Sequence, residues 1–286
     1  MAEVPKSMRR IVPRRARVAI GGRLPTYFNR RLRGVPERRW AVDAAAPDPV
    51  AGHVLGLPDF VGVGMMKSGT SWWYKLLCTH PDVYDDPRVH KEVHYFDQFA
   101  DKDFGLSAID DYKAWFGRPP GMRRGDFTAS YAQDRWILDL IAGSVPDAKV
   151  LVLLRDPVPR LLSHLNHVRG SGRVVDTHSL RRSIDASLYF DRLTDIFGAF
   201  RTDQVLVLQY EVCRADPNGE LGRTLEFLGL DPEGVPRLET DSWVPGVGYR
   251  TELPDHVERV AVPAIEEQAR RAAEEYGCID LGLWTC

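Results

Sequence analysis

The fold is constrained most strongly by three short apolar runs, which span residues 59–66, 148–156 and 204–211. Such runs are typical of strands that are buried on both faces of a sheet. The segments around them are predicted to be helical, at 70–80, 133–143, 187–200, 219–228 and 255–276, with a further helix beginning at Asp156-Pro157. Strands that alternate with helices predict an α/β fold, with three layers (α/β/α) and a central parallel sheet.

The first 40 residues differ in charge from the rest of the chain. They contain twelve Lys and Arg and two acidic residues, whereas the remainder contains 26 basic and 38 acidic residues. The stretch AVDAAAPDPVAG (41–52) has the composition of a linker. We therefore predict a basic N-terminal arm and linker over 1–50 and one domain over 51–286. The arm either binds an anionic membrane surface or substrate, or packs as a solvated segment on acidic patches of its own domain.

The chain lacks the sequence features of an exported or membrane-spanning protein. No apolar run reaches the roughly 18 residues of a membrane span, and arginines interrupt the apolar stretches near the N-terminus. No CxxC pair and no metal-binding spacing is formed by the four cysteines, Cys78, Cys213, Cys278 and Cys286. We expect free thiols in the cytoplasm, contact with a membrane at most peripherally through the arm, no metal and no nucleic-acid partner.

A phosphate-binding loop is predicted directly after the first strand, in GMMKSGTSWWYKLL (64–77). The loop is not a Walker A motif, because glycines would be needed in place of Met66 and Val61. Lys67 supplies a positive charge, and the following helix directs its first N–H groups at the loop. Small or hydroxyl side chains accompany it at Ser68, Gly69, Thr70 and Ser71. The segment predicts a site for a phosphate group without a metal, or else an ordinary turn with Ser/Thr capping.

A second anion site is predicted at the end of the second apolar run, in RDPVPRLLSHL (155–165). Arg155 stands first after the strand, where a nucleoside-triphosphatase would carry an acidic residue, and Ser163 follows two helical turns later. An arginine fork binds phosphate well, and a hydroxyl can add one hydrogen bond. Ligands of parallel sheets bind at the carboxyl ends of the strands. Two such sites at neighbouring strand ends therefore predict a nucleotide with phosphates at both ends.

Together these motifs resemble those of the sulfotransferases that use 3′-phosphoadenosine 5′-phosphosulfate (PAPS). KSGTSWW is similar to their 5′-phosphosulfate loop, RDPVPRLLSHL is similar to their 3′-phosphate motif, and the likeness spans about residues 59–230. The resemblance implies a P-loop-like fold in which Lys67 and residues 68–71 face the phosphosulfate. It places Arg155 and Ser163 at the 3′-phosphate.

The same resemblance implies contacts with the adenine ring. Trp72 occupies the position of the family tryptophan that stacks on adenine, and Tyr210 occupies that of a tyrosine that contacts it in cytosolic members. The alternative for both aromatic side chains is packing, on a helix face and at a strand end.

The reacting centre is predicted in KEVHYFDQF (91–99), which resembles the KExxFFD stretch of heparan-sulfate-type and bacterial sulfotransferases. There the glutamate takes the proton of the acceptor hydroxyl, and the resemblance gives this role to Glu92. His94 is the alternative base, because cytosolic members use a histidine. A third interpretation gives neither residue a catalytic role. Lys67 would stabilise the charge that develops on the departing phosphate.

The activity implied by the resemblance is in-line sulfuryl transfer from PAPS, which leaves adenosine 3′,5′-bisphosphate and needs no metal. The acceptor is expected to be a hydroxyl of a small molecule, a lipid such as a glycolipid, or a carbohydrate. The main alternative is an ATP-dependent small-molecule kinase of P-loop type, and a third class is a non-catalytic nucleotide-binding protein. The acceptor pocket is expected to be lined by aromatic residues, unless these pack within a helix: Phe104, Tyr112, Trp115 and Phe116.

One departure from the family pattern concerns the segment GDFTASYA (125–132). Heparan-sulfate-type members carry a second catalytic lysine where this sequence has Phe127, and a proline where it has Ala129. The resemblance therefore supplies no second lysine and puts a sugar-chain acceptor in question.

Overall fold

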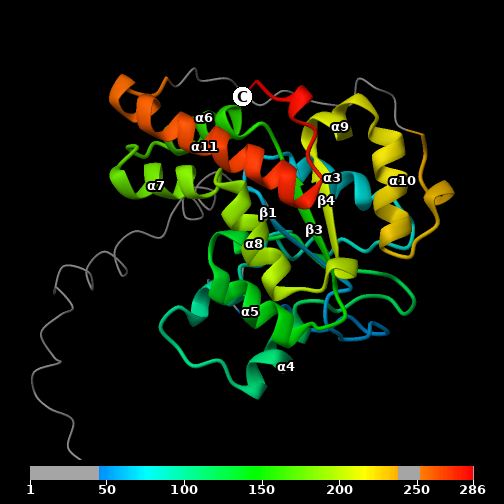
Figure 1. Cartoon of the computed structure of the whole chain (residues 1–286). Coiled ribbons are helices and arrows are strands. Elements are labelled where there is room, and N and C mark those ends of the chain that lie inside the picture. Colours follow the sequence, from blue (N-terminus) through cyan, green and yellow to red (C-terminus); the bar gives the residue numbers. More distant parts are fainter. Residues whose placement is uncertain (1–44, 238–251, 286) are drawn as a thin grey trace, which may run out of the picture. The chain divides into compact units, whose positions relative to one another are not determined.

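The computed structural model describes residues 45–237 and 252–285. Its centre is a parallel sheet of four strands in the order β2-β1-β3-β4 (Figure 1). The strands are β1 (Phe60–Gly64), β2 (Gly125–Asp126), β3 (Lys149–Leu154) and β4 (Val205–Gln209). The predicted parallel sheet is confirmed. The two-residue strand β2 was not predicted, because it is too short to show an apolar run.

Helices cover both faces of the sheet. Successive strand residues point to opposite faces, so that Val61 of β1 belongs to one core cluster and Phe60 to another. The first face is covered by α5 (Arg135–Ser144), α8 (Tyr189–Ala199) and α11 (Asp255–Tyr276). The second is covered by α3 (Thr70–Leu77), α9 (Tyr210–Ala215) and α10 (Pro217–Phe227). The three-layer architecture is therefore as predicted.

The remaining elements connect these layers. The helices are α4 (Leu106–Ala114), α6 (Pro157–Gly170) and α7 (Thr177–Asp185), of which α6 and α7 pack with α11 around a third apolar cluster. The 3₁₀ turns are η2 (Phe96–Phe99), η3 (Tyr131–Gln133), η4 (Thr202–Gln204), η5 (Pro232–Gly234) and η6 (Leu281–Leu283). Within the two described ranges, no helix combines the length and the apolar composition needed to cross a bilayer.

Two helix boundaries bear on the site. Helix α6 begins as predicted: the Asp156 carboxylate accepts a hydrogen bond from the N–H of Val158 (3.3 Å), and Pro157 occupies the first turn. The apolar run 204–211 was predicted to be a strand throughout, but the strand it forms, β4, ends at Gln209, and Tyr210 begins α9. Tyr210 is therefore a helix-start residue. Most of the predicted arm (residues 1–44) and Cys286 lie outside the described residues, and the boundary at residue 50 stays a prediction.

The aromatic residues expected to line an acceptor pocket belong to the core instead. Tyr112, Trp115 and Phe116 are at most 3% exposed, and they join the same cluster as Val61. Phe104 is half-buried and packs against that cluster. Because these rings are covered by neighbouring side chains, helix packing is the correct interpretation of this aromatic segment.

Candidate active site

The loop after β1 places Lys67 at the carboxyl edge of the sheet. Lys67 and Gly69 both have left-handed backbone conformations, with φ of 70° and 87°. Glycine is needed at position 69, because a Cβ atom there would lie 2.7 Å from the ring of Tyr210. No side chain caps the N-terminus of α3, so the Ser/Thr capping expected of an ordinary turn is not found. The start of α3, which has no side-chain cap, suits an anion, because the first N–H groups of a helix attract negative charge.

Positive charge is concentrated around Lys67. Burial lowers the pKa of its ammonium group, and the cations Arg155, Arg160 and Lys91 lower it further, whereas Glu92 raises it. The Arg155 guanidinium also donates a hydrogen bond from Nη1 to the Lys67 carbonyl (3.3 Å). Several cations held close together with one carboxylate can be stabilised by a multiply charged anion such as a phosphate.

Arg160 supports this loop, although the sequence placed it only on one helix face with Ser163, His164 and His167 and gave it no role. Its side chain is fully buried and donates from Nη1 to the Met66 carbonyl (3.1 Å), from Nε to Ser187 Oγ (2.9 Å), and to the Ser183 carbonyl. Burial lowers its pKa to about 10, which leaves the guanidinium charged at neutral pH. The only indication in the sequence is its spacing of three from Ser163, which places the two residues on one face of α6.

Three of the predicted nucleotide-binding residues lie side by side. The Arg155 guanidinium lies 5.0 Å from the centre of the Tyr210 ring, and that ring meets Trp72 edge-on at 6.1 Å. The residues come from the segment after β3, the start of α9 and the first turn of α3. Ser163 is half-buried in α6, and its contact with a phosphate stays a prediction.

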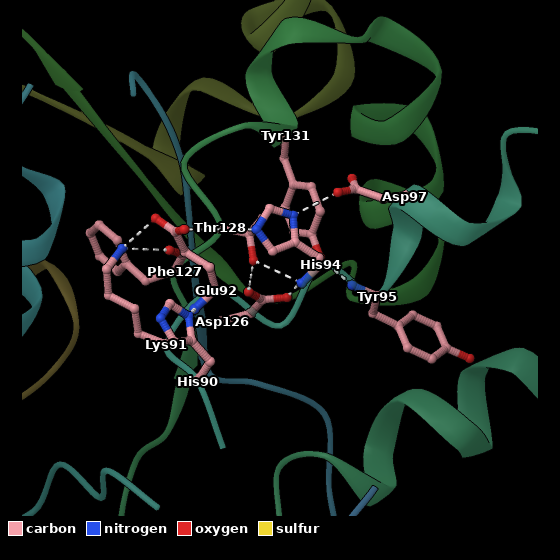
Figure 2. A network of polar contacts seen from close by, with 10 residues as sticks. All are labelled: His90, Lys91, Glu92, His94, Tyr95, Asp97, Asp126, Phe127, Thr128 and Tyr131. Atoms are coloured by element: carbon pink, nitrogen blue, oxygen red, sulfur yellow. Dashed lines mark hydrogen bonds and ion pairs between the residues drawn. The ribbon is translucent and has the colours of Figure 1, made fainter. Parts of the chain in front are cut away.

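Glu92 and His94 form a polar chain with Lys91 and Asp97 (Figure 2). Lys91 Nζ donates to Glu92 Oε1 (2.7 Å), while His94 lies with Nε2 3.7 Å from Glu92 Oε2 and Nδ1 2.6 Å from Asp97 Oδ2. Burial opposes the charge of Glu92, but Lys91 and His94 outweigh it and hold the carboxyl pKa well below its usual range. Burial also opposes the imidazolium, but Asp97 and Glu92 raise the His94 pKa to about 9. At neutral pH the carboxylate is therefore ionised and the imidazole is protonated.

The His94 imidazolium makes stability depend on alkaline pH. Its pKa rises from 6.5 to about 9 on folding, so its contribution is complete below pH 6.5 and is lost as the pH rises through 9. We expect the free energy of unfolding to fall over this window by on the order of 1–3 kcal/mol more in the wild type than in His94→Gln. Urea titrations at several pH values measure this, with exposed His178→Gln as the control. Parallel curves for wild type and His94→Gln would contradict the assignment.

Position 127, where related enzymes carry a lysine, holds a buried ring. Phe127 is fully buried and covers Gly62 so closely that a Cβ there would lie 2.6 Å from the ring. A cation nevertheless lies near: Lys91 Nζ is 5.7 Å from the ring centre and donates to the Phe127 carbonyl (3.3 Å). Lys91 is thus a second ammonium group close to Lys67 and Glu92, and the sequence did not single it out.

The fold and these contacts define a P-loop-like α/β protein with a cationic loop and an adjacent carboxylate at the carboxyl edge of its sheet. Residues 57–243 match the family described as Sulfotransferase domain, and the chain therefore belongs to the sulfotransferase family. This confirms the family that the sequence motifs predicted.

Individual relatives agree with this assignment. The chain is 29% identical over 216 residues to human heparan sulfate glucosamine 3-O-sulfotransferase 3B1, which covers 68% of this chain and 53% of that protein. It is 26% identical to mouse bifunctional heparan sulfate N-deacetylase/N-sulfotransferase 4, over 62% of this chain and 23% of that protein. The chain thus spans about half the length, or less, of these relatives.

A solved structure supports the fold. The crystal structure of a sulfotransferase from Alicyclobacillus acidocaldarius matches with a TM-score of 0.64 at 22% identity, over 80% of this chain and 99% of that chain. The predicted P-loop-like α/β fold is confirmed.

Proposed function

We propose that the protein is a PAPS-dependent sulfotransferase that transfers a sulfuryl group to a hydroxyl of a carbohydrate, lipid or small-molecule acceptor. The observation that carries the proposal is the Lys67 ammonium at the edge of the sheet, together with an ionised Glu92 carboxylate near enough to raise its pKa. A base and an electrostatic catalyst are the two groups that this reaction requires. Membership of the sulfotransferase family supports this activity and argues against the kinase alternative.

The residues at the strand ends fit the two charged ends of PAPS. Lys67 and the start of α3 would hold the 5′-phosphosulfate, with the backbone and hydroxyls of Ser68, Gly69, Thr70 and Ser71 beside it. Arg155 and Ser163 would hold the 3′-phosphate. The adenine would lie against Trp72 and Tyr210, whose rings already lie at the same end of the sheet. The fit rests on charge, because Lys67 has several cationic neighbours and one acidic neighbour.

The chemistry is a single in-line displacement at sulfur. Glu92 accepts the proton of the acceptor hydroxyl while the acceptor oxygen forms a bond to sulfur. The bond between sulfur and the phosphate oxygen breaks, and adenosine 3′,5′-bisphosphate leaves with that electron pair. Lys67 stabilises the negative charge that develops on this oxygen. The scheme requires no metal.

The protonation states favour Glu92 over His94 as the base. An imidazole with a pKa of about 9 is almost entirely protonated at neutral pH, so that very little of the neutral form that could act as a base is present. Glu92 is ionised, although Lys91 and His94 weaken it as a base. An anionic donor bound next to Lys67 adds negative charge near the carboxylate, which raises the Glu92 pKa toward the range useful for catalysis.

Arg155 provides a test of the nucleotide orientation. We expect Arg155→Ala to weaken the binding of adenosine 3′,5′-bisphosphate roughly 10- to 100-fold, because one charge-assisted contact is lost. The binding of adenosine 5′-phosphate should change much less, since it lacks the 3′-phosphate. Titration calorimetry compares the two ligands, with the exposed Arg169→Ala on α6 as the matched control. Equal losses for both nucleotides would contradict the role of Arg155.

The activity itself is tested by incubating the protein with sulfur-labelled PAPS and a panel of acceptors. The panel begins with heparan-type oligosaccharides, because the names of the two relatives described above specify heparan sulfate, and continues with glycolipids and phenols. The proposal predicts labelled product without added metal and no phosphate transfer from ATP with magnesium. Transfer of phosphate without any transfer of sulfate would contradict it.

The location in the cell remains part of the proposal. Cys213 and Cys278 are free thiols, which supports a reducing compartment such as the cytoplasm. Peripheral membrane contact is assigned to the basic arm, which lies mostly outside the described residues. Cell fractionation of the full chain and of a variant with the arm arginines replaced by glutamine tests both points, since only the wild type should co-sediment with anionic membranes.

A further inference from the structure

A buried hydrogen-bond network adjoins the backbone of His94 (Figure 2). Its centre is Asp126 on β2, whose side chain is fully buried. Three hydroxyl groups donate to this carboxylate: Thr128 to Oδ1 (2.5 Å), and Tyr112 (2.9 Å) and Tyr131 (3.1 Å) to Oδ2. A buried carboxylate with this many donors is stabilised in a fixed position, and the network lies outside the reacting groups named so far.

Two of the three hydroxyls also accept hydrogen bonds from the backbone of residues 91–99, the catalytic segment that contains Glu92 and His94. The N–H of His94 donates to Thr128 Oγ1 (3.3 Å), and the N–H of Tyr95 donates to the Tyr131 hydroxyl (2.9 Å). Each of these hydroxyls therefore donates a hydrogen bond to Asp126 and accepts one from a backbone N–H. The Tyr112 hydroxyl binds the same carboxylate oxygen as Tyr131, but no backbone N–H of residues 94 and 95 donates to it.

The backbone that these bonds hold is strained. His94 has a φ of 56°, in the left-handed region that a histidine adopts only when its surroundings fix it. This conformation turns the imidazole so that one nitrogen faces Glu92 (3.7 Å) and the other faces Asp97 (2.6 Å). The orientation of His94 therefore depends on the bonds made by its own N–H and by the N–H of Tyr95.

We propose that Asp126 is a positioning residue for sulfuryl transfer, which acts through Thr128 and Tyr131 to hold the His94 turn. The His94 imidazolium in turn holds the Glu92 carboxylate in place through their ion pair (3.7 Å). Without this ion pair the carboxylate can move away from the acceptor hydroxyl, which lowers kcat even though Glu92 becomes a stronger base. The inference rests on the proposed role of Glu92. Asparagine at position 126 would not substitute for the carboxylate, because its NH₂ group would face a hydroxyl that needs an acceptor.

The test compares two variants that remove one hydroxyl each from the same carboxylate oxygen. Tyr131→Phe removes a hydroxyl that holds the catalytic segment, whereas Tyr112→Phe removes one that does not. Both keep their buried rings, so packing is preserved in each. We expect kcat to fall roughly 10- to 100-fold in Tyr131→Phe and Thr128→Val, with the affinity for adenosine 3′,5′-bisphosphate unchanged. Thr128→Ser, which keeps the hydroxyl, and Tyr112→Phe should retain kcat near that of the wild type.

A second measurement does not depend on enzymatic activity. NMR titration of the His94 ring in the folded protein should give a pKa near 9 in wild type and in Tyr112→Phe. In Tyr131→Phe and Thr128→Val the pKa should move toward 6.5, because the ring loses its alignment with Glu92 and Asp97. If the wild type transfers no sulfate, the proposed function fails and this titration still decides the role of the network. Equal effects of Tyr112→Phe and Tyr131→Phe, or an unchanged His94 in Tyr131→Phe, would overturn the proposal.

Discussion

Replacing Lys67 by alanine is expected to lower the rate of sulfuryl transfer by at least about 10²–10³-fold, the usual effect of removing one preorganised group that stabilises developing charge. Lys67 lies at the turn between β1 and α3, and its ammonium is the cation assigned to the departing phosphate oxygen. The charge on that oxygen grows as the sulfur–oxygen bond breaks, so the loss should fall mainly on kcat. Single-turnover transfer from labelled PAPS measures the step directly.

The matched control for this experiment is Lys75→Ala. Lys75 lies in the last turn of the same helix, α3, and is exposed, so its removal changes the net charge equally without touching the loop. Wild-type turnover is expected in this control. Turnover in Lys67→Ala close to that of Lys75→Ala would remove Lys67 from the mechanism.

Glu92→Gln is expected to reduce transfer by about 10²–10⁴-fold, the range that a general base contributes. Glutamine has nearly the same shape, and its carbonyl oxygen can still accept the hydrogen bond from Lys91. It cannot take up the proton of the acceptor hydroxyl. The affinity for adenosine 3′,5′-bisphosphate should therefore remain close to that of the wild type while the chemical step stops.

Glu226→Gln, an exposed change of the same kind on α10, serves as the control. Full activity of Glu92→Gln would assign the base to another group. An acceptor with a hydroxyl that ionises easily, such as a nitrophenol, should recover part of the lost rate in Glu92→Gln, because it needs less help from a base. Absence of any recovery would argue that Glu92 has a structural role.

Much of the fold followed from local sequence patterns. The apolar runs placed β1, β3 and β4 because a strand buried on both faces tolerates few polar residues. Helix α11 was predicted at its observed bounds, 255–276, by its length and periodicity. Strand β2 could not be predicted, because two residues cannot show a period. Its parallel pairing with β1 is a long-range contact that no local pattern indicates.

The residues of the site could be predicted only where they belong to a recognisable sequence motif. Arg155 follows β3 directly and Lys67 lies in the loop that follows β1, and topology alone brings such positions together. Arg160 resembles many helix-surface arginines in sequence, and only the fold buries it under the loop. The same holds for Lys91, whose acceptor at the Phe127 carbonyl lies 36 residues away. Asp126 is connected to the His94 turn only through Thr128 and Tyr131, which accept from N–H groups 34 and 36 residues away, and no local pattern indicates the left-handed backbone of that turn.

The central claim is that the cations at the strand ends hold a nucleotide phosphorylated at both ends, and titration calorimetry tests it most directly. Adenosine 3′,5′-bisphosphate added to the wild-type protein without metal should give saturable heat at one site per chain, and Lys67→Ala and Arg155→Ala should each reduce its affinity. ATP with magnesium should bind much more weakly. Magnesium-dependent binding of ATP, together with no heat from the bisphosphate, would contradict the account.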